Sequence, residues 1–122
     1  MYEISVKASF SAAHHLRGYA GSCASLHGHN WEVEVFVQGE ALNGLGLLLD
    51  FRRLKQAVRE ELEALDHADL NSLEDFQAAN PSSENLARYL YRRLSARLAD
   101  GGRRVARVTV AETPGARASY WE

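Results

Sequence analysis

The chain has 122 residues, of which 46% are hydrophobic and 25% are charged, and its formal net charge is −2. This charge and the scattered arginines exclude a nucleic-acid surface of the usual basic kind, and no stretch reaches the roughly 20 apolar residues that span a bilayer. We expect one domain over residues 1–122, in the cytoplasm, because the N-terminus lacks a signal-peptide pattern and the lone Cys23 cannot form an internal disulfide.

Two strands are predicted in the first third of the chain. From residue 2 to residue 12 the even positions are apolar and the odd positions are polar, which is the period-two pattern of a half-buried strand. Residues 16–26 are rich in glycine and serine and read as a loop. A second alternating strand follows from about His27 to Gly39.

The apolar period then changes from two to about three and a half residues, which predicts helices. An apolar stripe runs from Phe51 to Leu65, with Asp50 as a suitable N-cap. A second helix is predicted to start at Ser82 or Ser83 and to end at the glycine pair 101–102.

Two more strands are predicted at residues 105–113 and 116–121. The resulting order, ββααββ, is typical of an α+β fold in which an antiparallel four-stranded sheet carries two helices on one face. Because a small sheet has open edges, which proteins tend to cover or to pair with another copy, we also expect a homo-oligomer.

The histidines of this chain favour a metal site. His27 and His29 are two residues apart at the start of a strand, so their side chains share one face. His14 continues the apolar face of the first strand, whereas His15 has the opposite parity. If the two strands pair as a hairpin, three imidazoles meet and bind zinc at roughly 2.0–2.1 Å, with a fourth position left open for catalysis.

Other interpretations of these residues are available. A histidine on an apolar face is more often a packed core residue, and an H-x-H pair alone is a weak signal; His14 in matching parity strengthens it. Cys23, four positions before His27, is either an inert small residue, a thiolate base beside a cation, or the fourth ligand of a closed structural zinc site.

Three polar residues elsewhere are candidates for the same site. Asp66 precedes His67, and an aspartate that contacts a histidine orients the ring and stabilises its charged form. Glu112 has the parity of an inward face, where a carboxylate needs a partner such as a ligand with two N–H donors. Thr113 would add a hydroxyl contact; the alternative is a strand-end charge that reaches solvent.

Six segments resemble those of one family, in the family's order and over nearly the whole chain. They are F-S-A-A-H-H-L at 10–16, C-A-S-L-H-G-H-N at 23–30, D-F-R-R-L-K at 50–55, L-D-H-A-D-L-N at 65–71, N-P-S-S-E-N at 80–85 and A-E-T-P at 111–114. The chain is therefore similar to the 6-pyruvoyltetrahydropterin and 6-carboxytetrahydropterin synthases. The most specific element is C-x-x-x-H-G-H joined to an upstream A-A-H.

This resemblance implies the tunnelling fold (T-fold), with subunits assembled into homohexamers made of two trimers and active sites between subunits. It also implies that zinc is held by His14, His27 and His29. One departure is His15, at a position where many relatives carry arginine; parity and the A-A-H alignment both favour His14 as the ligand.

The resemblance further implies the roles of the remaining candidates. Cys23 would be the catalytic thiol, with Asp66 and His67 as its proton-transfer partners. Glu112 would bind the amino and ring N–H groups of a pterin, with Thr113 beside it.

The implied enzyme is a zinc-dependent lyase acting on 7,8-dihydroneopterin triphosphate. The carboxy branch of the family yields 6-carboxy-5,6,7,8-tetrahydropterin, acetaldehyde and triphosphate, for queuosine and 7-deazaguanine synthesis, and the pyruvoyl branch leads to tetrahydrobiopterin. The compact chain resembles the short members of the carboxy branch, which we favour. The alternatives are the pyruvoyl synthase, a non-catalytic zinc protein, and a pterin aldolase or epimerase of the same fold.

Overall fold

Four antiparallel strands form most of the sheet in the computed structural model, which describes residues 1–122. Strands β1 (Tyr2–His14) and β2 (His27–Gly39) pair along their whole length. Strand β4 (Arg103–Thr113) pairs with the other edge of β2, and β5 (Ala116–Tyr120) pairs with β4. The predicted strands are all present, and the α+β architecture is confirmed.

A fifth, very short strand corrects the prediction of a four-stranded and wholly antiparallel sheet. Strand β3 (Ala68–Asp69) pairs in parallel with β1 at Ala12 and Ala13. The strand order is therefore β3-β1-β2-β4-β5. Two residues are too few to show a period of two, so no sequence pattern marks this strand.

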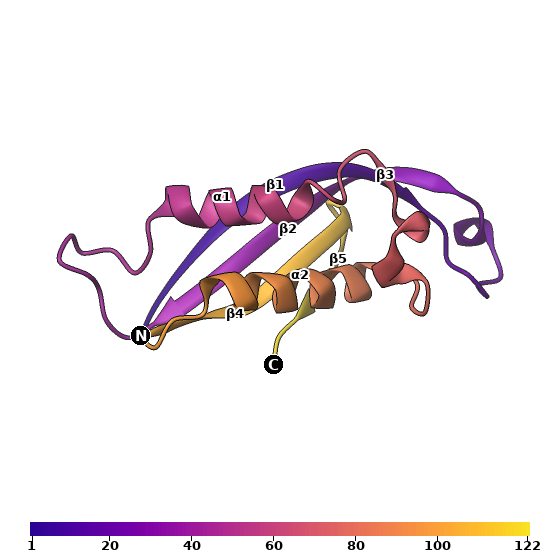
Figure 1. Ribbon diagram of the computed structural model, residues 1–122. Helices are drawn as coiled ribbons and strands as arrows, with labels where there is room; N and C mark the ends of the chain where they lie inside the picture. Colours follow the sequence, from indigo (N-terminus) through magenta and orange to yellow (C-terminus); the bar gives the residue numbers. More distant parts are fainter.

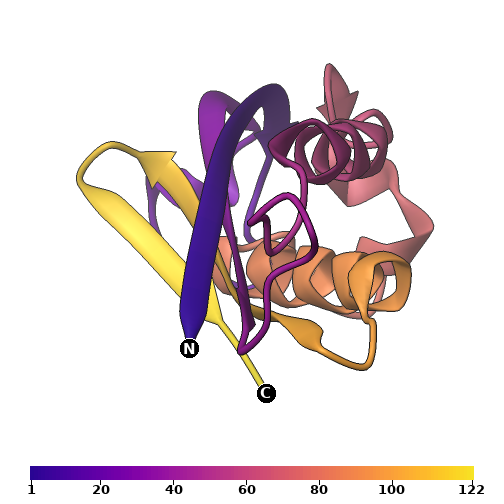
Figure 2. The ribbon, with the colours of Figure 1, turned by 90° about the vertical axis from the view of Figure 1, so that its left-hand side faces the viewer.

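Helices α1 (Phe51–Leu62) and α2 (Ser83–Leu98) both lie on one face of the sheet, as Figures 1 and 2 show. Each begins at a predicted N-cap: the Asp50 side chain accepts a hydrogen bond from the Arg52 amide, and the Ser82 side chain accepts one from the Asn85 amide. Helix α2 ends before the glycine pair 101–102, which instead turns the chain into β4. Neither helix is apolar over enough length to cross a membrane.

The core lies between the helices and the inner face of the sheet. Its fully buried side chains include Trp31, Val33, Val35 and Val37 of β2 and Leu54, Leu86, Leu90 and Leu94 of the helices. Phe51 starts the predicted apolar stripe but is 50% exposed, because it is the first residue of α1. The outer face of the sheet is polar, with side-chain hydrogen bonds such as Ser5 to Glu34.

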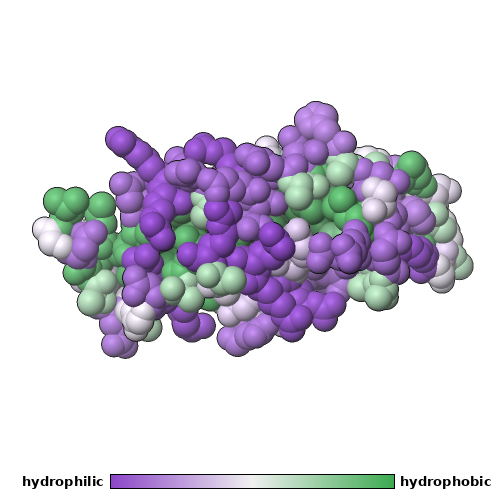
Figure 3. Space-filling view, viewed as in Figure 1, coloured by the Kyte–Doolittle hydropathy of each residue, from purple (hydrophilic) through white to green (hydrophobic).

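The loop of residues 40–50 joins β2 to α1 and exposes leucine side chains. The Asn43 side chain accepts hydrogen bonds from the Leu45 and Leu47 amides, which closes a tight turn. Leu45 is 84% exposed at this turn, and Leu42 and Leu47 are more than a third exposed. Figure 3 shows hydrophobic colouring at the end of the molecule where Figure 1 places this loop, in contrast with the hydrophilic outer faces of the helices.

Gly39 ends β2 where three segments meet closely. A Cβ atom built at this position lies 2.6 Å from the Gly102 carbonyl oxygen and 2.6 Å from a methyl carbon of Leu48. We expect Gly39→Ala to lower the free energy of unfolding by about 1–3 kcal/mol, because the backbone must move to admit the methyl group. Urea unfolding measures this, with Gly44→Ala as the control, since nothing lies within 4 Å of that position. Equal stability of the two variants would contradict the packing argument.

Candidate metal centre and active site

The β1–β2 hairpin brings three imidazole rings together at one end of the sheet. His14 lies directly opposite His27 in the register, and His29 is the next residue on the same face of β2. The ring centroid of His14 is 4.6 Å from that of His27 and 5.2 Å from that of His29, and the latter two are 4.8 Å apart. The pairing and the parity predicted from the sequence produce this convergence, and His15 is not part of it.

Trp31 forms the core side of this histidine cluster. Its side chain is fully buried, and its ring contacts those of His14 and His29 edge-on, at centroid distances of 4.8 and 5.2 Å. Its indole N–H donates to the Ala12 carbonyl oxygen at 3.2 Å. A rigid apolar wall on one side strengthens electrostatic interactions in the cluster, because water cannot screen them from that side.

Backbone carbonyl groups fix the orientation of two of the rings. The Nδ1 atom of His14 is 2.7 Å from the Pro81 carbonyl oxygen, and the Nδ1 atom of His27 is 2.7 Å from the Ser25 carbonyl oxygen. A carbonyl oxygen only accepts hydrogen bonds, so each Nδ1 carries the proton and each neutral ring has a free lone pair on Nε2. This arrangement is typical of histidines that bind metals through Nε2.

Glu112, from β4, completes a group of four side chains that could hold a metal ion. One carboxylate oxygen of Glu112 is 3.1 Å from the Nε2 atoms of both His14 and His29. The ligand atoms of the three histidines and Glu112 all lie within 4.8 Å of one another. The parity argument placed Glu112 on the inward face correctly, but it did not indicate that its carboxylate would contact the histidines.

The potential ligand atoms of this group face each other, and no hydrogen-bond donor lies between them. His14 is 1% exposed, and the buried Nε2 atoms of His14 and His29 make no hydrogen bond. Burial lowers the pKa of His29, Glu112 opposes this, and the neighbouring rings of His14 and His27 add to the lowering. A neutral His29 is the form that binds metal. Three imidazole nitrogens and one carboxylate oxygen are a donor set that fits zinc.

Asp66 and His67 lie beside β1, where they contact each other. The Nδ1 atom of His67 is 3.0 Å from one oxygen of Asp66, and the other oxygen accepts a hydrogen bond from the Ser11 amide at 2.9 Å. His67 has a φ of 59°, a conformation that most side chains avoid, and its amide donates to the Ser11 carbonyl oxygen at 2.6 Å. This strained backbone presents an imidazole that is 82% exposed.

The interaction with Ser11 makes Asp66 sensitive to acid. The Ser11 amide, and then His67, lower the pKa of Asp66 below its ordinary 3.8. A carboxyl group with a lowered folded-state pKa stabilises the protein above its unfolded-state pKa and loses that effect as the pH falls through the folded-state value.

We therefore expect Asp66→Asn to lower stability modestly at about pH 7, and the difference from wild type to shrink below about pH 4. Urea unfolding at both pH values tests this. Glu63→Gln is the control, because Glu63 is an exposed carboxylate without an ion pair. A difference that does not change with pH would contradict the linkage.

Cys23 lies in a short turn, η1 (Ser22–Ala24), between the two strands that carry the histidines. Its thiol is half-buried and free, and it is not a member of the four-residue metal-ligating group. Its carbonyl oxygen accepts a hydrogen bond from the Leu16 amide at 2.9 Å, which ties the turn back to the end of β1. No hydrogen bond joins Cys23 to Asp66 or His67 within one chain.

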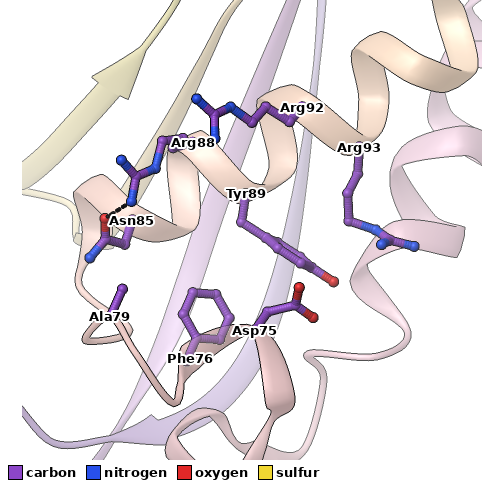
Figure 4. Close-up of a pocket in the computed structure, with 8 residues that line it drawn as sticks. All are labelled: Asp75, Phe76, Ala79, Asn85, Arg88, Tyr89, Arg92 and Arg93. Atoms are coloured by element: carbon purple, nitrogen blue, oxygen red, sulfur yellow. Dashed lines mark hydrogen bonds between the residues drawn. The ribbon is translucent and has the colours of Figure 1, made fainter.

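A hollow of about 280 Å³ lies apart from this site, between α2 and the turn η3 (Glu74–Phe76). Figure 4 shows Phe76 and Tyr89 at its base and three arginines along α2. Each guanidinium already has an acceptor: Arg88 bonds Asn85, Arg92 bonds Glu122 and Arg93 bonds Glu61. Two of the three guanidinium groups are thus neutralised by a carboxylate, and Arg88 bonds only a neutral amide. The hollow also contains no group of potential metal ligands, so the histidine cluster stays the candidate site.

Comparison with known proteins identifies the family of the chain. A family model described as 6-pyruvoyl tetrahydropterin synthase matches residues 3–122. The chain belongs to the 6-pyruvoyl tetrahydropterin synthase family. The solved 6-pyruvoyl tetrahydropterin synthase of Caenorhabditis elegans superposes with a TM-score of 0.89 at 28% identity, over 99% of this chain and 95% of that one. Members of this family among its structural neighbours share the T-fold, which confirms the predicted fold.

Relatives in the family carry different activity names. A protein of Archaeoglobus fulgidus, provisionally described as a 6-carboxy-5,6,7,8-tetrahydropterin synthase, is 39% identical over 89% of this chain and 86% of its own length. The dihydroneopterin monophosphate aldolase of Pyrococcus furiosus is 38% identical over 72% of this chain and 70% of its own. The 6-carboxy-5,6,7,8-tetrahydropterin synthase of Bacillus subtilis is 34% identical over 80% and 68%, respectively.

Proposed function

We propose that this chain is a zinc-dependent 6-carboxy-5,6,7,8-tetrahydropterin synthase. In this proposal 7,8-dihydroneopterin triphosphate and water give 6-carboxytetrahydropterin, acetaldehyde and triphosphate, in the direction of 7-deazaguanine synthesis. Support for this branch comes from the relatives of Archaeoglobus and Bacillus, which carry this activity name and cover most of the chain.

The observation that carries the metal part of the proposal is the pair of buried, unbonded Nε2 atoms. His14 Nε2 has a free lone pair and lies 3.1 Å from a carboxylate oxygen. Two acceptors at this distance repel each other unless a cation lies between or beside them. His14, His27 and His29 would hold zinc, and bound zinc supplies a Lewis acid that polarises oxygen atoms of the substrate side chain.

The protein side chains supply proton transfer. We assign Cys23 as the thiol that takes and returns protons on the pterin side chain, because it is half-buried beside the strand that carries two histidines. Asp66 holds His67 at 3.0 Å, and this exposed imidazole gives and accepts protons with Asp66 stabilising its charged form. No contact joins the thiol to this pair within one chain, which agrees with an active site completed by a second subunit.

The assembly we propose is a hexamer made of two trimers. Strand β1 pairs with β3 only at Ala12 and Ala13, and Ser11 bonds Asp66 and His67, so residues 2–10 of β1 present an unpaired edge, and β5 presents the other edge of the sheet. Pairing of such edges between subunits would close the sheet into a barrel. Light scattering coupled to size-exclusion chromatography measures the number of chains, and a monomer would contradict the proposal.

Glu112 is proposed to bind the N–H groups of the pterin, with the exposed Thr113 beside it. Its carboxylate is 31% exposed, so it can turn from the histidines toward a ligand. We expect Glu112→Gln to raise KM by about 10- to 100-fold, because a charged hydrogen-bond acceptor is lost, while zinc affinity changes little. Steady-state kinetics and zinc titration separate the two effects. A large loss of zinc affinity would make Glu112 a metal ligand instead.

Product analysis tests the proposed reaction directly. The zinc-loaded protein is incubated with 7,8-dihydroneopterin triphosphate, acetaldehyde is assayed, and the pterin is identified by mass spectrometry. We expect acetaldehyde and 6-carboxytetrahydropterin in equal amounts. A 6-pyruvoyl product without acetaldehyde would assign the chain to the pyruvoyl branch.

An aldolase is a second candidate, favoured by the similarity to the Pyrococcus enzyme. A retro-aldol cleavage of the pterin side chain leaves a hydroxymethyl group on the ring and releases a two-carbon aldehyde that carries the phosphate. The same incubation, repeated with the dihydroneopterin monophosphate, distinguishes this reaction. A 6-hydroxymethyl product formed from the monophosphate would replace the synthase proposal.

A further inference from the structure

The chain beyond β1 is held at its edge by side chains rather than by a neighbouring strand. Strand β3 ends its pairing with β1 at Ala13. The next residue on that side is His15, and the one after it is Arg17. In an extended chain the N–H and C=O groups of alternate residues point to the same edge, so His15, directly after the strand, needs partners there. Arg17 lies in the turn that follows, and its backbone groups also need partners.

Two asparagine side chains supply these partners in the same way. The Asn71 side chain accepts from the His15 N–H at 2.8 Å and donates to the His15 C=O at 3.1 Å. The Asn80 side chain accepts from the Arg17 N–H at 2.9 Å and donates to the Arg17 C=O at 3.1 Å. Each primary amide thus replaces one backbone peptide group of a missing strand.

Both asparagines are themselves held in place. Asn71 is 8% exposed. Its backbone N–H donates to the Asp69 side chain, and its backbone carbonyl oxygen accepts from the Gln77 side chain at 2.7 Å. The carbonyl oxygen of Asn80 accepts from the Asn85 side chain at 2.8 Å, which ties it to the first turn of α2. We call these two asparagine side chains, Asn71 and Asn80, the clamps. Each clamp is itself held by hydrogen bonds to neighbouring residues.

The position of His14 depends on these two clamps. Its own backbone precedes the residue that Asn71 holds, and its Nδ1 donates to Pro81, the residue after Asn80. Residues 71–81 therefore hold both the backbone next to His14 and the His14 ring. The same clamps hold the start of the loop between β1 and β2. Within this loop the Leu16 amide donates to the Cys23 carbonyl oxygen.

We propose that Asn71 and Asn80 are positioning residues that hold His14 in the orientation required for metal binding. This inference rests on the proposed zinc site, and it adds two residues whose side chains bond the backbone near His14 rather than the side chains of the proposed ligands. Outer residues that orient a ligand commonly change metal affinity by about 10- to 100-fold. Because the clamps act through the backbone, we expect an effect at the lower end, about tenfold.

The test uses Co²⁺ as the probe, on the full-length protein freed of metal. Co²⁺ affinity, the visible absorption spectrum of bound Co²⁺ and the thermal midpoint of the metal-free protein are measured for Asn71→Ala and Asn80→Ala. The matched control is Asn43→Ala, because Asn43 also accepts from two backbone amides but lies in the loop before α1. We expect both clamp variants to lose about tenfold in Co²⁺ affinity and to show a changed spectrum, and the control to keep both.

The outcomes separate positioning from mere stability. Clamp variants that melt earlier but bind Co²⁺ with wild-type affinity and spectrum would overturn the inference. If Asn71→Ala does not fold, Asn80→Ala and Asn71→Asp, which keeps the acceptor for the His15 N–H, decide the question by the same two readouts. A wild-type chain that binds neither Co²⁺ nor Zn²⁺ would instead overturn the proposed function, and this inference with it.

Discussion

Replacing His14 by alanine is expected to reduce zinc affinity by about 10²–10³-fold and to reduce turnover to background. Structural zinc sites provide roughly 10–16 kcal/mol of binding free energy, so the loss of one of three histidine ligands is expected to cost a few kcal/mol. His14 is 1% exposed and lies between two other imidazoles, so water has little room to replace its nitrogen. Zinc affinity is measured by competition with a chelator, and turnover by the acetaldehyde assay.

His15→Ala is the matched control for this experiment. It removes an imidazole from the next position, outside the group of converging ligand atoms. It leaves the His15 backbone free to bond Asn71 as before. We expect zinc affinity within about twofold of wild type. If His15→Ala loses zinc and His14→Ala keeps it, the ligand has been misassigned by one residue.

The parity of the strands explains why the histidine cluster could be predicted from sequence. In β1 and β2, apolar and polar residues alternate over most of the strands, and the histidines continue the apolar parity. Alternation fixes which side chains share a face, and a hairpin with the two strands adjacent in sequence fixes which ends meet. The caps at Asp50 and Ser82 were equally local, since each side-chain oxygen accepts a hydrogen bond from a backbone amide two or three residues later in the chain.

The parts that the sequence did not predict depend on residues far apart in the chain. Strand β3 pairs residues more than fifty positions apart and is only two residues long. The Pro81 carbonyl that orients His14 is a backbone group, which every residue has, so no residue type marks it. Glu112 was placed on the correct face, but its contact with the histidines depends on the register between β2 and β4, which includes a bulge. Alternation within one strand cannot reveal such a shift.

Replacing Cys23 by serine or alanine is expected to lower kcat by about 10²–10⁴-fold while zinc affinity stays near that of wild type. Loss of a positioned proton-transfer group has an effect of this size, and the serine hydroxyl is too weak an acid to replace the thiol at neutral pH. A separate role for the thiol is consistent with the structure, because Cys23 is not among the residues whose potential ligand atoms converge.

The two variants together distinguish this role from a structural zinc site. If Cys23 were a fourth zinc ligand, both variants would lose zinc and would also melt at a lower temperature, because ligand binding stabilises the folded state. If the thiol transfers protons, both keep zinc, and the Co²⁺-substituted variants show the wild-type absorption spectrum. Co²⁺ bonded to a thiolate absorbs strongly in the near ultraviolet, so the loss of such a band in Cys23→Ser would contradict proton transfer as the only role of the thiol.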